Sequence, residues 1–283
     1  MNRNESLYSL AHAGVVDLAI VGGGATGLGV ALDAALRGYS VALLESHDFA
    51  GGTSSRSTKL LHGGVRYLAQ GNVSLVREAL HERQSILAIA PHLAAPLSFV
   101  MPAYAWWKLP FYTIGLKLYD LLAGRAGLGA TEWLSRRETA QALPGVQVRG
   151  LHGGVKYWDA QFDDARLALA IARTARAAGA NVLNHVKVAN LQALEGQSDG
   201  AKWALDWQNQ KGVEQGVLRA KCVVNAAGVW VVVASSEGMG DRGFGNCRGG
   251  DFASSPGLDR WRWVARRFSA KGGSAQTHPQ RMH

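Results

Sequence analysis

Cysteine is scarce in this sequence. Only Cys222 and Cys247 occur among 283 residues, and neither lies in a Cys-x-x-Cys pattern. This scarcity excludes a disulfide framework and a cysteine-ligated zinc site, and it indicates a reducing compartment. We expect no metal centre.

Long apolar runs are absent as well. Residues 1–16 have no sustained apolar core followed by a cleavage site, and the apolar run that begins at Asp17 is too short to span a bilayer. The sequence therefore predicts a flexible N-terminus over residues 1–16 and a cytoplasmic protein. Peripheral attachment to the cytoplasmic membrane is the alternative location.

Acidic residues are outnumbered by basic ones. The 21 Asp and Glu residues stand against 30 Lys and Arg residues, which gives a formal net charge of +9. Such an excess suits an anionic substrate, a nucleic acid or an acidic membrane surface equally well. Eight of the basic and four of the acidic residues fall in 231–283, so part of the excess is local. We expect no nucleic-acid partner.

Residues 231–283 also lack the side chains that form a core. They contain nine glycines, one leucine and no isoleucine, with no helical or strand period. The sequence predicts a disordered tail there. A different hypothesis takes its basic segment 261–268 (WRWVARRF) as a membrane- or nucleic-acid-binding element.

What the sequence does contain begins with a strand, turn and helix pattern. Residues 17–21 are apolar, 22–29 are rich in glycine, 30–37 are rich in Ala and Leu, and 40–44 form a second apolar run closed by Glu45. The order predicts a βαβ unit with parallel strands and a right-handed crossover.

The glycine-rich turn has the spacing of a dinucleotide-binding loop. Gly22, Gly24 and Gly27 form Gly-x-Gly-x-x-Gly, and Ala25 and Thr26 complete it at the mouth of the helix. The first glycine allows the tight turn, the second lets a pyrophosphate approach the backbone, and the third allows close helix packing. The alternative is that these glycines form a turn in an α/β protein that binds no dinucleotide.

Glu45 closes the second strand, where a carboxylate can accept hydrogen bonds from an adenosine ribose. A negative charge there repels a 2′-phosphate, which disfavours NADP. NAD and FAD remain equally compatible with the turn and with Glu45. We expect a cleft around Gly24, Glu45 and Thr53, where the parallel strands end.

Three later segments have regular patterns. Residues 164–178 indicate a helix, and 181–191 and 221–227 indicate strands. An amphipathic helix is expected over 73–90. Its apolar stripe comprises Val76, Leu80, Leu87 and Ala90, with Arg77, Glu78, Glu82 and Arg83 placed elsewhere.

Four separated segments resemble FAD-dependent glycerol-3-phosphate dehydrogenases, which belong to the D-amino-acid-oxidase-like superfamily. They are Gly51–Tyr67 (GGTSSRSTKLLHGGVRY), Arg77–His92, Tyr157–Leu167 (YWDAQFDDARL) and Val223–Trp230 (VVNAAGVW). The last has Val229 where the family has proline. The resemblance covers about residues 17–230 and selects FAD over NAD. It implies an α/β fold, a Rossmann-like FAD-binding domain (GR2/DAO-type) over 17–230 with a partial substrate-domain insertion at about 93–160.

The resemblance also implies roles for individual residues. Hydroxyl and ammonium groups would face the flavin diphosphate, glycines would approach the flavin, and the main chain of Val188 would touch the adenine. These residues are Thr53, Ser54, Ser55, Ser57, Lys59, His62, Gly63, Gly64, Val188, Ala227 and Gly228. Plain loop or core positions are the alternative for the serines, for Lys59 and for Val188.

The implied reaction is oxidation of sn-glycerol 3-phosphate to dihydroxyacetone phosphate, with electrons passed to a quinone. Arg66 would bind the phosphate, Tyr67 would donate a hydrogen bond, and His62 would be the base or alkoxide stabiliser. A structural role for His62 is equally compatible with the sequence. A related amine or amino-acid oxidase is the alternative enzyme.

Two family motifs, GVRP-like and GGKLTT-like, do not occur, and the resemblance stops after Trp230. We therefore expect a chain truncated or frame-shifted at that point, with little or no turnover. A non-catalytic FAD-binding remnant is the matching alternative.

Two further groups of residues have a structural interpretation as well as a functional one. Aromatic and basic residues at 106–112, followed by 113–124, suit either a membrane interface or core packing. A metal or acid site is one interpretation of the group formed by Asp159, Asp163, Asp164 and Arg166. The family resemblance instead implies that Asp164 and Arg166 are helix-capping and structural pairing residues.

Overall fold

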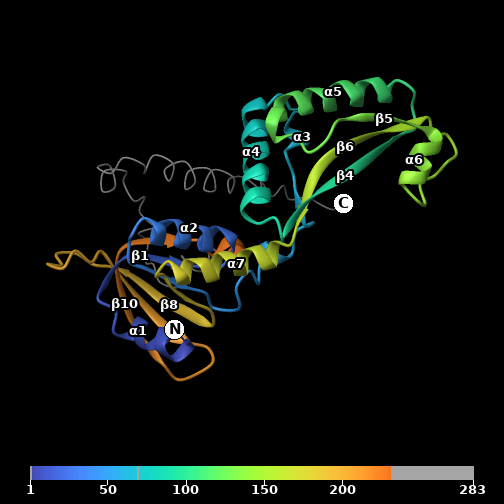
Figure 1. The fold of residues 1–283 in the computed structure, drawn as a ribbon. Helices are drawn as coiled ribbons and strands as arrows, with labels where there is room; N and C mark the ends of the chain where they lie inside the picture. Colours follow the sequence, from blue (N-terminus) through green and yellow to red (C-terminus); the bar gives the residue numbers. More distant parts are fainter. Residues whose placement is uncertain (1, 69, 231–283) are drawn as a thin grey trace, which may run out of the picture.

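The computed structural model describes residues 2–68 and 70–230, which form two β-sheets with helices packed on them (Figure 1). The tail expected to be disordered, 231–283, lies outside the described residues. A single chain thus builds two layered units, one around each sheet.

The first sheet has six strands in the order β7-β2-β1-β10-β9-β8. The four strands from β7 to β10 are parallel, and β9 and β8 continue the sheet antiparallel. This confirms the parallel βαβ unit, because β1 and β2 pair in parallel and the helix α2 connects them along the chain. The strands are β1 Val15–Val21, β2 Val41–Leu44, β7 Asn181–Leu183, β8 Val186–Ala193, β9 Trp203–Asn209 and β10 Gln215–Asn225.

Helices cover both faces of this sheet. On one face lie α2 (Ala25–Leu36) and α7 (Asp164–Ala177), which pack side by side in Figure 1. Successive strand residues point to opposite faces, so Ile20 packs under α2 while Ala19 packs on the other side, where α1 (Arg3–Ala11) lies. Each face therefore buries its own apolar cluster.

The second sheet is built around the long strand β6. Strand β4 pairs with β6 along one edge, and β3 and β5 share the other edge. Helices α3, α4 and α5 lie together beside it, with α6 at its far end (Figure 1). The elements are β3 Leu60–Leu61, α3 Val65–Leu68, α4 Val73–Ile89, β4 Ala94–Ala103, α5 Lys108–Ala123, β5 Glu132–Ser135, α6 Arg136–Ala142 and β6 Gly153–Phe162. Short 3-10 turns occur at Thr53–Ser55, Gly124–Ala126 and Gly228–Trp230.

The N-terminus differs from the flexible segment that the sequence predicted. Asn2 caps α1 in a capping box with Glu5, which satisfies two backbone N–H groups at the start of the helix. Leu7 and Leu10 are buried against the first sheet. Burial of these two leucines holds a helix that is too short to be stable alone.

Two strand expectations also need correction. The strand expected over 181–191 is two strands, β7 and β8, because His185 adopts a left-handed backbone (φ 52°) between them. The strand expected over 221–227 starts six residues earlier, at Gln215, since its first half pairs with β9 rather than with β1. A local turn thus decides the first boundary, and long-range pairing decides the second.

A recurring heptapeptide shows the same influence of context. Residues 61–67 (LHGGVRY) and 151–157 (LHGGVKY) are nearly identical. The first copy leads from β3 into α3, whereas the second enters β6. Different backbone structures support the view that the recurrence is coincidental and not a structural repeat.

We predict that Leu10→Ala lowers the free energy of unfolding by about 2–5 kcal/mol, because Leu10 is 1% exposed in the α1 contact. Leu36→Ala, at a leucine that is 67% exposed on α2, should change it by no more than about 0.5 kcal/mol. Urea unfolding of both variants checks this. Equal effects would mean that α1 does not pack on the sheet.

Candidate functional site

Three strand ends of the first sheet converge at one point. Gly22 N–H, just after β1, donates to Leu44 O of β2 at 2.9 Å, and Ala226 N–H, just after β10, donates to Val21 O at 2.8 Å. In the sheet, β1 has β2 and β7 on one side and β10, β9 and β8 on the other, and the chain crosses from the first side to the second after β7, so the end of β1 is the sheet's topological switch point. Ligands of open parallel sheets bind at such points.

The strand ends can approach one another closely at this junction because glycines there have no side chains. Gly22 has φ 112°, and a Cβ there would lie 2.5 Å from Ala226 O. A Cβ on Gly27 would collide with Gly22 O. Gly24 is different, because its Cβ would meet only the Ser54 hydroxyl, at 3.3 Å. The first and third glycines therefore serve the fold, and Gly24 leaves an open backbone face.

Helix α2 begins at this open face. Gly24 is its N-cap and has no side chain to cap the helix, so the N-terminal N–H groups and the positive end of the helix dipole face outward. Ala25 N–H donates to Ser54 Oγ at 2.9 Å, which brings the turn that contains Thr53 and Ser54 against the helix start. Ala25 and Thr26 form the first residues of the helix beside that turn.

Glu45 lies at the same junction. Its Oε2 accepts the Gly23 N–H at 2.6 Å, and its Oε1 accepts the His47 N–H at 2.8 Å and the Ser46 hydroxyl at 3.3 Å. A carboxylate can accept about four hydrogen bonds, so Glu45 keeps acceptor capacity beyond these three. The carboxylate is thus fixed in orientation and still able to accept a further hydroxyl.

The other segments expected to contact the cofactor lie around this point. Val186 N–H donates to Glu45 O, which puts the start of β8, with Val188, beside the end of β2. Ala227 and Gly228 follow β10 directly, and Gly228 has φ 62°. Trp230 packs on Gly52, where an added Cβ would lie 3.0 Å from the indole.

A buried carboxylate anchors the following loop. Asp164 accepts the Ser57 hydroxyl at 2.5 Å and pairs with Lys59 Nζ, which also donates to Ser55 O at 2.8 Å. Burial alone would raise the pKa of Asp164, but the hydrogen bonds from Lys59 and Ser57 outweigh it and hold that pKa below its usual value. Lys59 is therefore ion-paired, not a freely solvated loop residue.

The helix cap was assigned to the wrong neighbour. Asp163, not Asp164, is the N-cap of α7, where its Oδ1 accepts the Arg166 N–H at 3.0 Å. Asp164 instead faces the 55–59 loop. Among the described residues no group of His, Cys, Asp and Glu is arranged to hold a metal ion.

His62, Gly63 and Gly64 continue the loop between β3 and α3. The His62 side chain is 60% exposed, and its Nδ1 lies 3.7 Å from Asp159 Oδ2. Tyr67 follows on α3 and is partly exposed. Arg66 belongs to the same helix, but its side chain lies outside the described part of the chain.

The sequence did not reveal the buried polar cluster beneath this loop. Arg83 is 2% exposed, although we expected it off the apolar stripe of α4. Its Nη1 donates to Asp159 at 3.0 Å and to the Tyr119 hydroxyl at 3.2 Å. The spacing of Val76, Leu80 and Arg83 on one helical stripe was the available signal. A charged residue on that stripe needs a buried partner, which only the fold identifies.

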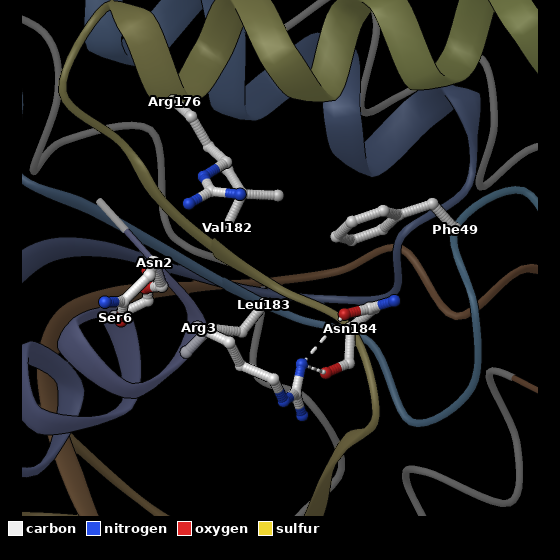
Figure 2. A pocket seen from close by; sticks show the side chains of 8 residues that line it. All are labelled: Asn2, Arg3, Ser6, Phe49, Arg176, Val182, Leu183 and Asn184. Carbon is white, nitrogen blue, oxygen red and sulfur yellow. Dashed lines mark hydrogen bonds between the residues drawn. The ribbon is translucent and has the colours of Figure 1, made fainter.

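A separate pocket lies at the edge of the first sheet, between α1, β7 and α7 (Figure 2). Its volume is about 220 Å³. It is lined by Asn2, Arg3, Ser6, Phe49, Arg176, Val182, Leu183 and Asn184. Arg3 donates to the Asn184 carbonyl and side-chain oxygens and to Asn209 Oδ1, all at 2.9 Å, so its guanidinium joins α1 to the turn after β7 and to the end of β9. We assign this pocket no ligand.

The strand-end junction fits a dinucleotide. An open glycine face and a helix N-terminus whose N-cap residue has no side chain suit a diphosphate, and the Glu45 carboxylate suits a ribose hydroxyl. Glu45 accepts the Gly23 N–H beside Gly24, and Thr53 begins the turn whose Ser54 hydroxyl accepts the Ala25 N–H, so the residues around which a cleft was expected lie near one another. The cleft itself stays a prediction. These features define a dinucleotide-binding α/β protein of the doubly wound type.

Comparison with known proteins narrows that class. The model of the "FAD dependent oxidoreductase" (DAO) family matches residues 17–247, and the chain belongs to this family. FAD is therefore its cofactor, and the fold is the Rossmann-like FAD-binding fold that the sequence predicted.

Individual relatives are glycerol-3-phosphate dehydrogenases. The chain is 46% identical over 237 residues to the mitochondrial enzyme of Macaca fascicularis and 42% identical over 237 residues to that of Saccharomyces cerevisiae. These alignments cover 80% and 81% of this chain but only 32% and 36% of the relatives. The crystal structure of the Bacillus halodurans glycerol-3-phosphate dehydrogenase complexed with FAD matches with a TM-score of 0.61 and 31% identity. That match covers 83% of this chain and 38% of the other.

We expect Gly24→Ala to weaken FAD binding at least about tenfold, or ~1.4 kcal/mol, because the methyl group occupies the face that the diphosphate approaches. The variant should fold normally, since only the Ser54 hydroxyl lies near the added Cβ.

Gly29→Ala is the matched control on the same helix, where an added Cβ has no neighbour within 4 Å. It should leave affinity unchanged. Fluorescence titration with FAD measures both variants, and equal affinities would place the diphosphate elsewhere.

Proposed function

We propose that the chain is the FAD-binding part of a dehydrogenase that oxidises sn-glycerol 3-phosphate to dihydroxyacetone phosphate. The identity of 42–46% to mitochondrial glycerol-3-phosphate dehydrogenases over 237 residues is the observation that carries this proposal. The chain spans about a third of the length of those relatives, so the activity of the whole protein is inferred from this shared part.

In this proposal the first sheet holds the cofactor and the second forms part of a substrate domain. FAD supplies the hydride acceptor. The chain's own residues bind the diphosphate at Gly24 and Ser54, hold the ribose at Glu45, and place His62 at the substrate side. His62 accepts the proton of the substrate hydroxyl, and Arg66 with Tyr67 binds the phosphate.

Anaerobic addition of sn-glycerol 3-phosphate to the FAD-loaded protein tests the reaction in a single turnover. We expect the visible flavin absorbance to fall slowly with this substrate, in line with the low turnover expected from the sequence, and to stay constant with glycerol, which lacks the phosphate. An unchanged spectrum with both compounds would refute the proposal. An artificial electron acceptor then tests the low turnover that the sequence predicts, and turnover equal to that of a full-length relative would contradict it.

The proposal extends to a quinone acceptor reached from a membrane surface on the cytoplasmic side. No helix within 2–68 and 70–230 is long and apolar enough to cross a membrane. Helix α5 nevertheless exposes an apolar stripe opposite its buried one. The exposed residues are Phe111, Ile114, Leu118 and Leu121, preceded by Trp106 and Trp107. The buried residues are Leu109, Leu116, Tyr119 and Ala123.

This double-sided pattern favours insertion of the exposed stripe into a lipid surface, with Lys108 and Lys117 available to anionic headgroups. Core packing explains the buried side of the helix but leaves the exposed side without a partner among the described residues. A quinone dissolved in the membrane would then lie close to the protein.

We predict that Ile114→Ser/Leu121→Ser lowers the partition of the protein onto anionic phospholipid vesicles at least about tenfold, since each buried leucine or isoleucine contributes roughly 1.5–3 kcal/mol. Leu36→Ser/Leu169→Ser, at exposed leucines of α2 and α7, should have no effect. Vesicle co-sedimentation measures the partition. Equal loss in both double variants, or no binding by the wild type, would refute a membrane contact at α5.

A further inference from the structure

Strand pairing sets His62 opposite a buried carboxylate. In the antiparallel ladder, Leu60 pairs with Gln161 and Leu61 with Ala160. The next position along the ladder brings His62 to Asp159, where the Nδ1 to Oδ2 distance is 3.7 Å. The Asp159 side chain is only 4% exposed, whereas His62 extends to the surface. The imidazole therefore has one nitrogen beside a buried acid and the other toward the outside.

The remaining acceptor sites of Asp159 are mostly occupied. Its Oδ1 accepts from Arg83 Nη1 at 3.0 Å and from the Ala160 N–H at 3.2 Å. The Gly63 N–H is shared between Oδ1 at 3.1 Å and Oδ2 at 3.2 Å. Oδ2 therefore retains a lone pair on the side of His62. The Arg83 charge compensates the buried carboxylate, which isolated burial would penalise strongly.

Close packing prevents this carboxylate from moving away. A Cβ on Gly63 would collide with the Tyr119 hydroxyl, so the loop lies directly on that phenol. Burial raises the pKa of Tyr119, and the Asp159 charge raises it further, so the phenol stays neutral. Arg83 is fixed on the other side, since its Nη2 donates to Ala126 O at 2.9 Å. Arg83 and Tyr119 thus each make a further contact besides those within the cluster.

We propose that Asp159 is a positioning residue for His62: a small rotation of the exposed imidazole shortens the 3.7 Å separation to a hydrogen bond, in which Asp159 accepts the Nδ1–H and leaves Nε2 unprotonated toward the substrate. This inference rests on the proposed function of His62. During oxidation the substrate O–H bond breaks and its proton goes to Nε2, while the carbinol hydride leaves for the flavin and a carbonyl forms. The positive imidazolium then lies beside the Asp159 charge, which stabilises it.

The direct test does not require turnover. Nitrogen-15 NMR of the histidine side chains, with His62→Gln used to assign the His62 signals, reports which ring nitrogen carries the proton in the neutral form. We expect the Nδ1–H tautomer in the wild-type protein, with and without FAD. An Nε2–H tautomer would overturn the inference, whether or not the protein oxidises glycerol 3-phosphate.

A variant separates positioning from folding. Asp159→Asn should slow flavin reduction by sn-glycerol 3-phosphate about 10²–10⁴-fold and shift His62 toward the Nε2–H tautomer, because an amide can donate to Nδ1. FAD affinity and the substrate concentration for half-maximal rate should stay within about threefold. An unchanged rate in folded Asp159→Asn protein would refute the role.

If this variant does not fold, the wild-type tautomer decides the question alone. Reduction that fails in the wild type as well would instead refute the proposed function, and the NMR result would stand independently.

Discussion

The junction of β1, β2 and β10 is possible because Gly22 has no side chain. A Cβ on Gly22 would lie 2.5 Å from Ala226 O. Gly27 must also lack a side chain, because a Cβ there would collide with the Gly22 carbonyl oxygen. The strand ends can then share hydrogen bonds across the junction. Helix α2 starts at the same place, so the sheet, the helix N-terminus and Glu45 converge on one open glycine face.

Two acids of the segment 157–167 connect this junction to the second sheet. Asp164 holds the loop at Ser57 and Lys59, and Asp159 holds the turn at Gly63 through its backbone N–H. Both carboxylates are almost fully buried, so each needs its cationic partner, Lys59 or Arg83. The segment from Ser57 to Gly63 is thereby fixed at two points, one at Asp164 and one at Asp159.

Local patterns in the sequence were enough to predict the nucleotide-binding part of the fold. The spacing of Gly22, Gly24 and Gly27 between two apolar runs specifies the turn because each glycine has a separate steric reason. Helix α1 was missed, although Asn2 and Glu5 have the spacing of a capping box. Only two leucines of α1 join the core, and their burial depends on the sheet.

Features that depend on distant partners were not predictable in this way. Arg83 is buried because Asp159 lies opposite, 76 residues later in the chain. The first half of β10 is a strand because it pairs with β9, although its own sequence alternates weakly. The family resemblance singled out His62, but its proximity to Asp159 follows only from the register of β3 on β6. The sequence therefore predicted the strand, turn and helix of the first sheet better than the side-chain pairs that depend on distant partners.

The central claim is that the strand-end junction binds FAD. The most direct measurement is to saturate the purified protein with an equimolar mixture of FAD and NAD, remove unbound nucleotide by gel filtration, denature the protein and identify what is released by chromatography. The account predicts FAD in about equal amount to the protein and no NAD. Release of NAD, or of no nucleotide from protein shown to be folded by circular dichroism, would contradict it.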